Sequence, residues 1–280
     1  MKIQHLRNAS AILTIAEHVL LLDPMFSEPG ALPAFKQVGG GRRNPLVPMP
    51  PDLEASLAAL TGVVITHEHP DHFDPPALAW VRERNLPVWT NAVDAPNLRR
   101  KGLDVHELVD GALGMAIEVI PTQHGRGLIG FMMGPVSGCY LAHPAAPSLY
   151  ITSDAVLTDA LLDAVDRLQP DVIVAPAGAA NFGIGGDILF SVDELITLIQ
   201  HAPGEVVLNH LEAIDHCPTT RVELRRRMRE AGLSERVHVP EDGETLEFER
   251  RSASEHRRPR AAAPRRPGLQ KWLTAKFAGT

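Results

Sequence analysis

The chain has 280 residues, enough for one large hydrophobic core or two smaller ones. Its hydrophobic fraction of 44% is ordinary for a globular protein, and its net charge of −7 argues against a general nucleic-acid binder. Cys139 and Cys217, the two cysteines, provide no disulfide framework, so we expect a reducing, cytoplasmic setting. We expect no transmembrane helix, because no apolar run approaches about 18 residues, and no signal peptide, because Glu17, His18 and Asp23 interrupt the first apolar segment.

Three β-strands are expected before residue 24. Residues 2–7 and 10–16 alternate between apolar and polar side chains, and residues 19–22 are apolar. Asp23 precedes a proline and ends the third strand. We interpret it first as a turn residue, with a place near a functional site as the alternative.

Residues 24–51 are rich in proline and glycine and are expected to form a long loop. Such a loop in a compact domain is usually functional or disordered. Arg42 and Arg43 could bind a phosphate or carboxylate of a substrate, although a purely solvated loop explains them equally well.

The most informative segment is Thr-His-Glu-His-Pro-Asp-His at residues 66–72. It follows an apolar run at residues 62–65, which predicts a buried strand. It precedes Asp74-Pro75, which predicts the start of a helix with Asp74 as its cap. A strand therefore leads into a short loop that carries imidazoles and a carboxylate, the ligand types that hold zinc and similar divalent ions.

The spacing within this segment predicts two neighbouring ions. His67 and His69 point the same way in an extended chain and can bind one ion together. Pro70 breaks the strand, so that Asp71 and His72 can face a second ion. Two ions about 3.5–4 Å apart can share a hydroxide and stabilise the transition state of a hydrolysis.

The pattern His67-x-His69-x-Asp71-His72 after a strand resembles the signature of the metallo-β-lactamase superfamily. The strand–turn–strand–Asp-Pro opening resembles its ascorbate-6-phosphate lactonase group. The resemblance covers roughly residues 1–248. It implies an α/β fold, a four-layer αββα sandwich with the metal site at one edge of the two sheets, and a domain that spans residues 1–249.

The later segments alternate between strands and helices, as an α/β fold requires. Helices are expected at 52–60, 75–84, 95–101, 154–168, 191–201 and 219–231, and strands at 62–65, 87–90, 105–108, 115–121, 137–142, 148–152, 171–175, 205–208, 237–240 and 245–248. Ser191 and Glu194 match a capping box. The glycines between residues 125 and 130 predict a flexible loop.

The resemblance implies three further ligands, each of which ends an expected strand. The full set is His67, His69 and His124 for the first ion, and Asp71, His72 and His210 for the second, with Asp154 bridging the two. Simpler interpretations remain: His124 as a loop histidine, and Asp154 as the N-cap of the helix that runs to residue 168. The surrounding Ser153-Asp154-Ala155 departs from the family's usual Gly-Asp-Thr.

His216 competes with His210 for the last ligand position. We favour His210 as the ligand and assign His216 a place behind it or facing the substrate. Asn181 lies in the glycine-rich stretch 176–183, which we expect to line the site.

These residues predict a dinuclear metal-dependent hydrolase of a small molecule. A metal-bound hydroxide would attack an ester, lactone or phosphodiester, with Asp71 receiving a proton and His210 completing the second site. The ions would be two Zn²⁺, with Mn²⁺ or iron also compatible with these ligands. The alternatives are an iron-dependent oxidoreductase on the same ligands, or a non-catalytic protein that retains metal.

Residues 250–280 form a basic tail rich in arginine and proline, which we interpret as a disordered linker with a short terminal helix. The apolar face of that helix could make weak contact with a membrane surface or a partner. No specific nucleic-acid partner is expected.

Overall fold

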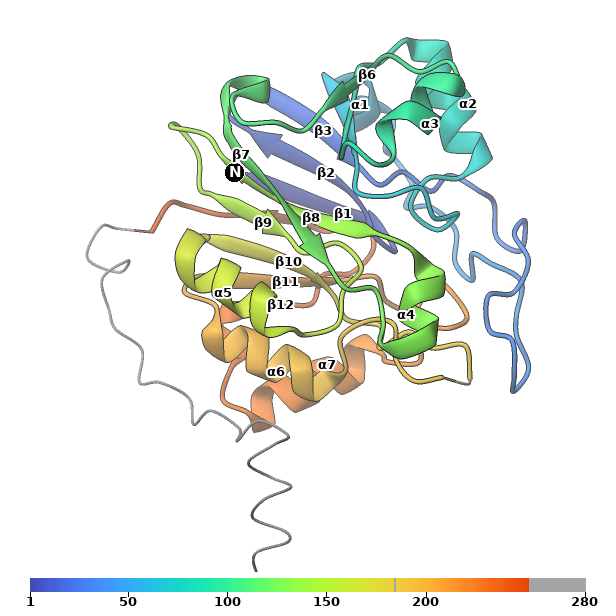
Figure 1. The fold of residues 1–280 in the computed structure, drawn as a ribbon, viewed down its shortest axis with the longest axis vertical. Coiled ribbons are helices and arrows are strands. Elements are labelled where there is room, and N and C mark those ends of the chain that lie inside the picture. The colour runs from blue at the N-terminus through green and yellow to red at the C-terminus, as the bar shows by residue number, and fades with distance from the viewer. Residues whose placement is uncertain (184, 252–280) are drawn as a thin grey trace, which may run out of the picture.

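The computed structural model describes residues 1–183 and 185–251. Two β-sheets lie face to face, and helices cover the outer face of each sheet (Figure 1). This four-layer αββα arrangement confirms the predicted fold class. The predicted tail helix and linker fall on residues outside the described part of the chain.

The first sheet combines a β-meander with parallel strands. Its order is β13-β1-β2-β3-β4-β5-β6, with β1 Lys2–Arg7, β2 Ser10–Ile15, β3 His18–Leu22, β4 Gly62–Ile65, β5 Val88–Thr90, β6 Val105–Glu107 and β13 Thr245–Glu247. Strands β1 to β3 are antiparallel, whereas β3 to β6 run parallel to one another.

The second sheet repeats this topology. Its order is β12-β11-β10-β9-β8-β7, with β7 Ala116–Thr122, β8 Val136–Ala142, β9 Leu149–Ile151, β10 Val172–Pro176, β11 Glu205–Asn209 and β12 Val237–His238. Strands β7 to β9 are antiparallel and β9 to β12 are parallel. The sequence shows no internal repeat, so only the structure reveals that the two halves share one strand plan.

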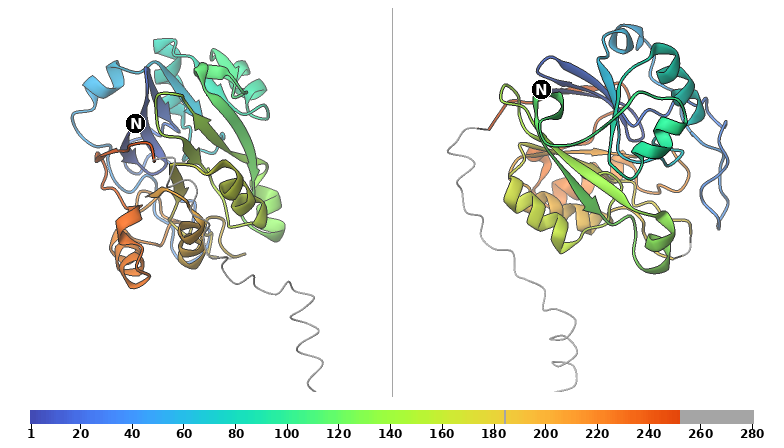
Figure 2. Two further views of the ribbon diagram at one scale, coloured as in Figure 1. Left: turned by 90° about the vertical axis from the view of Figure 1, so that its left-hand side faces the viewer. Right: turned by 45° about the horizontal axis from the view of Figure 1, so that its top comes forward.

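Each sheet has its own layer of helices, as the two further views also show (Figure 2). Helices α1 Glu54–Ala58, α2 Pro75–Arg84 and α3 Ala95–Arg100 accompany the first sheet, and α5 Asp159–Leu168, α6 Val192–His201 and α7 Arg221–Glu230 accompany the second. A further helix, α4 Gly127–Met133, stands apart from both layers. Two short 3-10 turns, Ala112–Gly114 and Ser234–Arg236, complete the described helices.

The alternation of side chains along the strands explains the layers. In β2, Ala11, Leu13 and Ile15 point into the core between the two sheets, whereas Ile12 joins the core beneath the first helical layer. Successive side chains of a strand face opposite sides of a sheet. Both faces of this strand are therefore buried, as expected for a central sheet.

Several predicted boundaries are wrong. The helix that we expected from Asp154 begins at Asp159, and its cap is Thr158, whose side chain accepts from Leu161 N. The helix that we expected at residues 52–60 spans only Glu54–Ala58, and Asp52, with a positive φ of 60°, lies outside it. Helix α4 replaces the flexible loop that the local glycines indicated. The Asp74 cap and the Ser191–Glu194 capping box are confirmed.

The loop at residues 24–51 is fastened at both ends. The fully buried guanidinium of Arg7 donates to the carbonyls of Met25 (2.7 Å), Ser27 (3.1 Å) and Val47 (2.9 Å). At the tip of the loop, the carboxylate of Asp215 accepts from three backbone N–H groups, those of residues 35, 36 and 42, and from the Asn44 amide. The loop is therefore held against the segment that follows β11.

This anchoring gives a first prediction. Asp215→Ala should leave the sheets folded but free residues 35–43, because several charge-assisted hydrogen bonds are lost together. Limited proteolysis should then cut within that segment at least several times faster than in the wild type. Asp110→Ala is the control, since that carboxylate accepts one longer bond, 3.3 Å from Ile117 N. Equal protection of the loop in the Asp215 variant would contradict the anchoring role.

Candidate metal centre

Seven ligand-type side chains meet at one edge of the two sheets. They follow four different strands: four residues come after β4, and one each after β7, β9 and β11. The carboxyl ends of parallel strands commonly form binding sites. Figure 1 shows the loop at residues 24–51, helix α4 and the loops after β10 and β11 gathered on this same side.

The donor atoms form two groups. Within each group, one donor atom per residue lies within 4.8 Å of the others, and the members are His67, His69 and His124 in the first group and Asp71, His72, Asp154 and His210 in the second. All seven predicted ligands are thus brought together. Of the two candidates for the last ligand position, His210 lies in the second group and His216 lies outside both groups.

Asp154 lies between the two groups. Its Oδ2 is 3.4 Å from His124 Nε2 and 4.0 Å from His67 Nε2, on the side of the first group. Its Oδ1 is 3.2 Å from His72 Nε2 and 3.7 Å from His210 Nε2, on the side of the second. One carboxylate oxygen therefore faces each group, as a bridging ligand requires.

The second ring nitrogen of each imidazole has its own partner. His72 Nδ1 lies 2.9 Å from Asp23 Oδ2, and His124 Nδ1 lies 2.9 Å from the carbonyl of Ile188. Acceptors at Nδ1 place the hydrogen there and leave the Nε2 lone pair directed at the centre. Partners of this kind orient metal-binding histidines.

His67 and His210 are held by hydroxyl and thiol groups. His67 Nδ1 lies 3.0 Å from Thr66 Oγ1 and 3.3 Å from Ser153 Oγ, and His210 Nδ1 lies 3.4 Å from Cys217 Sγ. Ser153 has a positive φ of 55°, a conformation that glycine adopts more easily. The serine that departs from the family's glycine therefore contributes a contact to a ligand.

Helix α4 contributes to the first group. The carbonyl of Met133, its last residue, lies 3.2 Å from His69 Nε2, which leaves Nδ1 of that ring for the centre. No sequence pattern indicated this contact, because the carbonyl belongs to a helix that we expected to be a loop.

Electrostatics within the centre favour a bound cation. Burial lowers the pKa of His67 well below its ordinary value, so this imidazole is neutral. At His72, burial is outweighed by the negative charges of Asp154 and Asp23, which raise its pKa to about 10. The carboxylates therefore attract positive charge to the second group, and a divalent ion can supply it.

The ligand set fits a pair of divalent ions. Asp154 Oδ1 is buried and accepts no well-formed hydrogen bond among the described residues; it makes an ionic contact with His72 Nε2 at 3.2 Å. An unpaired buried carboxylate oxygen is costly, and a cation would satisfy it. The donors are imidazole nitrogens and carboxylate oxygens, which suit Zn²⁺ and also Mn²⁺ or iron.

A small cavity lies among the ligands of the second group. It has a volume of about 10 Å³, room for at most one water, and its lining includes His72, Asp154 and His210. The loop at residues 24–51 and the segment around residue 182 meet His216 on the side of His210 where that ring lies.

His216 forms part of an aromatic cluster on that side. Its ring stacks on Phe182 with centroids 5.7 Å apart, and it meets Phe35 edge-on at 5.5 Å. Its centroid is 6.5 Å from that of His210. Burial lowers the pKa of His216 to about 4, so it is a neutral imidazole beside the ligands.

The other predicted substrate-facing residues are engaged locally or exposed. Asn181 uses its amide within its own loop, through the Ala179 carbonyl at 3.2 Å and the Gly183 N–H at 3.1 Å. The guanidinium of Arg43 donates to two carbonyls of its own loop, at 2.6 and 2.8 Å. The side chain of Arg42 is exposed.

Asp23 was undervalued by the sequence interpretation. Its carboxylate accepts from Thr66 N and Thr66 Oγ1, both at 2.7 Å, besides contacting His72. It follows β3, which runs parallel to β4, so it reaches the same edge as the central motif. The sequence signal for the contact between Asp23 and His72 is a pair of expected strands that each end in ligand-type residues.

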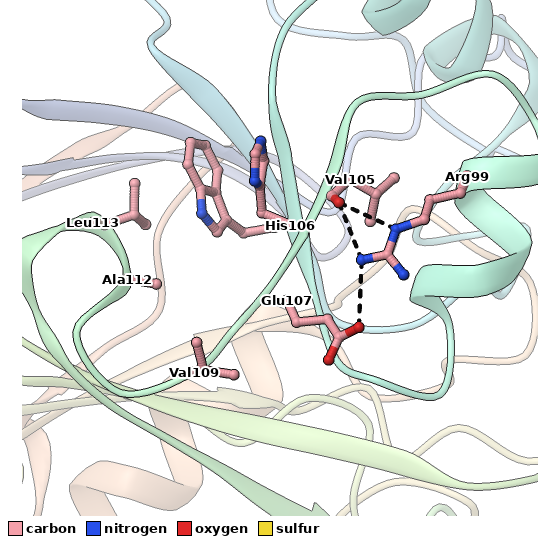
Figure 3. A pocket seen from close by; sticks show the side chains of 8 residues that line it. Arg99, Val105, His106, Glu107, Val109, Ala112 and Leu113 are labelled. Carbon is pink, nitrogen blue, oxygen red and sulfur yellow. Dashed lines mark hydrogen bonds and ion pairs between the residues drawn. The ribbon is translucent and has the colours of Figure 1, made fainter.

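A larger hollow lies elsewhere, at the β5–β6 edge of the first sheet (Figure 3). It has a volume of about 570 Å³, and its wall includes Trp89 and His106, whose rings stack. Arg99 points across it but already binds the Val105 carbonyl and Glu107. None of the seven clustered ligands lines this hollow, so size alone does not make it the candidate site.

Comparison with known proteins identifies the family. A family model described as "Beta-lactamase superfamily domain" matches residues 18–211, more than half of the chain. This chain belongs to the beta-lactamase superfamily. The chain is similar to UPF0173 protein YddR of Bacillus subtilis (strain 168), with 32% identity over 256 residues, which cover 89% of this chain and 100% of that protein.

Solved structures agree with the superfamily assignment. Isothiocyanate hydrolase from Delia radicum gut bacteria is similar with a TM-score of 0.81 and 30% identity, covering 89% of this chain and 99% of that one. A possible metal-dependent hydrolase from Veillonella parvula DSM 2008 reaches a TM-score of 0.81 at 25% identity, covering 88% and 98%. The predicted family is confirmed, and the chain resembles metal-dependent hydrolases. Among its described helices, none has the length and apolar character needed to cross a membrane.

The ligand geometry predicts that His69→Ala removes metal and activity together. Without this imidazole the first group keeps two histidines, too few to hold an ion tightly. Metal content per chain should fall, and hydrolysis should drop by at least about 100-fold. His106→Ala, which removes an imidazole outside the centre, should keep both. Full metal content and turnover in the His69 variant would refute the assignment.

Another prediction concerns Asp23. Asp23→Asn keeps the shape of the side chain but removes the charge that faces His72, so metal affinity should weaken by about 10- to 100-fold. Competition against a chromophoric chelator measures this change. Asp171→Asn is the control, because that carboxylate binds Ser148 far from the ligands. Unchanged affinity in the Asp23 variant would show that His72 is oriented without it.

Proposed function

We propose that this protein is a dinuclear metal-dependent hydrolase of small organic molecules. The observation that carries the proposal is the position of Asp154, which turns one carboxylate oxygen toward each ligand group. Such a carboxylate is suited to hold two ions side by side. His67, His69 and His124 would hold one ion, and Asp71, His72 and His210 the other.

The ions and the protein have separate tasks in this reaction. Bound there, divalent ions supply the Lewis acidity that activates water at neutral pH and stabilises negative charge on the substrate. Asp71 faces His210 through Oδ2, at 3.3 Å from Nε2. Its other oxygen is available to orient the attacking water and receive its proton.

The surroundings favour an uncharged substrate with an apolar substituent. Phe35, Phe182, Ile129 and Met133 are partly buried and pack against one apolar cluster. That cluster includes Cys217, whose Sγ lies 3.4 Å from His210 Nδ1. Of Arg42 and Arg43, the two residues that we considered for binding an anion, Arg43 is engaged by carbonyls of its own loop and Arg42 is exposed. An isothiocyanate, ester or lactone, each with an electrophilic carbon, suits this wall better than a phosphodiester.

The similarity to an isothiocyanate hydrolase supports the same choice. An isothiocyanate carries its apolar group next to the carbon that water attacks, so the reacting atoms can lie at the ions while the substituent contacts the phenylalanines. We therefore rank isothiocyanates first, and esters or lactones second.

The test combines elemental analysis with three reporter substrates. We expect close to two zinc or manganese ions per chain, with hydrolysis of an aromatic isothiocyanate and an aromatic ester that stops after chelation and returns on adding metal. A phosphodiester reporter should react much more slowly.

Other outcomes separate the rival functions. Iron with oxygen consumption would indicate an oxidoreductase on the same ligands. Two bound ions without turnover of any reporter would indicate a metal-retaining binding protein. Preference for the phosphodiester would overturn the substrate class but keep the hydrolase.

A further inference from the structure

The turn between β1 and β2 lies against the second ligand group. Its first residue, Asn8, is fully buried and has a left-handed φ of 57°. Asparagine adopts this conformation more readily than most other side chains. The turn thereby brings residues from the start of the chain to two ligands that lie far along it.

Asn8 contacts both of these ligands through their backbone. Its side-chain Nδ2 donates to the carbonyl of Asp71 at 2.9 Å. Its own carbonyl accepts from the N–H of His210 at 2.8 Å. Asp71 and His210 face one another across the second group, with Oδ2 and Nε2 3.3 Å apart.

The orientation of the Asn8 amide is determined by Asp71. A flipped amide would set Oδ1 against the Asp71 carbonyl oxygen, so only Nδ2 fits there. Oδ1 is left buried without a hydrogen-bond partner among the described residues. That unpaired oxygen costs free energy. The amide is stabilised instead through Nδ2, which donates to the Asp71 carbonyl at 2.9 Å and contacts Met25 Sδ more weakly at 3.9 Å.

His210 depends on the turn for another reason. It has a positive φ of 58°, which is unusual for a residue with a bulky side chain. Surrounding contacts must maintain such a conformation. The bond from its N–H to the Asn8 carbonyl is one of them, and it fixes the point from which the imidazole extends.

The first ligand group is supported by different residues. His67 is held by Thr66 and Ser153, and His124 by the carbonyl of Ile188. Among the seven clustered residues, the hydrogen bonds of Asn8 reach only Asp71 and His210 of the second group. Its other contact is with Met25 Sδ, 3.9 Å from Nδ2. A change at this residue should therefore affect the two ions unequally.

We propose that Asn8 is a positioning residue for the second metal ion, holding Asp71 through its side chain and His210 through its backbone. This inference rests on the proposed dinuclear centre, because it distinguishes one ion from the other. It assigns a function to a hairpin turn whose sequence contains no metal-binding motif.

The test measures the binding of Zn²⁺ to the full metal-free chain by competition with a chromophoric chelator. Asn8→Gly keeps the left-handed backbone but removes the amide, and Asn8→Ala removes the amide and adds strain. Both should weaken the second ion by about 10- to 100-fold and leave the first unchanged. Weaker binding of the second ion in both variants would report the lost hydrogen bond. Weaker binding in Asn8→Ala alone would indicate backbone strain and overturn the role of the side chain.

Thr90→Val is the matched control. Thr90 Oγ1 is buried in the same sheet and donates to the carbonyl of Ile65 at 2.8 Å, a carbonyl that belongs to none of the seven clustered residues. It should lower the melting temperature of the metal-free protein about as much as Asn8→Gly but leave both ions in place. Equal weakening of both ions by the Asn8 variants, or the same selective loss in the control, would overturn the inference.

The outcomes also separate this inference from the function on which it rests. Wild-type protein that binds two ions, with Asn8 variants that bind them equally well, refutes only the role of Asn8. Wild-type protein that binds fewer than two ions under metal excess refutes the dinuclear centre and this inference together.

Discussion

Three buried carboxylates, those of Asp23, Asp71 and Asp154, lie at one edge of the two sheets among five imidazoles. Burying charge is costly unless each charge is paired or binds a cation. Asp23 meets this cost with hydrogen bonds from Thr66 and the ring of His72. Asp154 lacks this compensation, since its Oδ1 accepts no well-formed hydrogen bond in the described chain. Positive charge between the carboxylates would therefore stabilise this arrangement, and a bound cation can provide it.

The repeated strand plan of the two sheets brings this chemistry to one place. Each sheet turns from a meander into parallel strands, and the carboxyl ends of β4 in one and of β9 and β11 in the other reach the same edge. The two ligand groups then acquire different supports, which the hydrogen bond from Thr66 Oγ1 to Asp23 joins. The first relies on hydroxyls and on the end of α4, while the second relies on Asp23 and the β1–β2 turn. Neighbouring ions can thus have different affinities although they share Asp154.

Apolar side chains lie close to the charged centre. His216, whose ring is 6.5 Å from that of His210, stacks against Phe182, and the neighbouring loop is held by Asp215. Leu128, Phe131 and Met132 are exposed at 74%, 83% and 74% on α4, the helix whose last carbonyl contacts His69. Under the function that we propose, such apolar surroundings suit a molecule whose reactive carbon is polar and whose substituent is not.

The sequence by itself determined the α/β class and the central motif, because alternating apolar runs and the spacing of His67, His69, Asp71 and His72 are local properties. With the family resemblance it also named His124, Asp154 and His210, which the structure brings together with the motif. It left open whether Asp23 is a turn residue or a residue near the site. It did not predict the contacts of Asn8 and Met133 with the ligands, nor the hydrogen bonds of Asp215 to the loop. Those roles depend on backbone carbonyls, on left-handed residues and on strands that become neighbours only when the sheets form. Side-chain chemistry and hydrophobic periodicity can be read from local sequence. Contacts between distant segments form only in the folded chain, so the tertiary structure alone decided these roles.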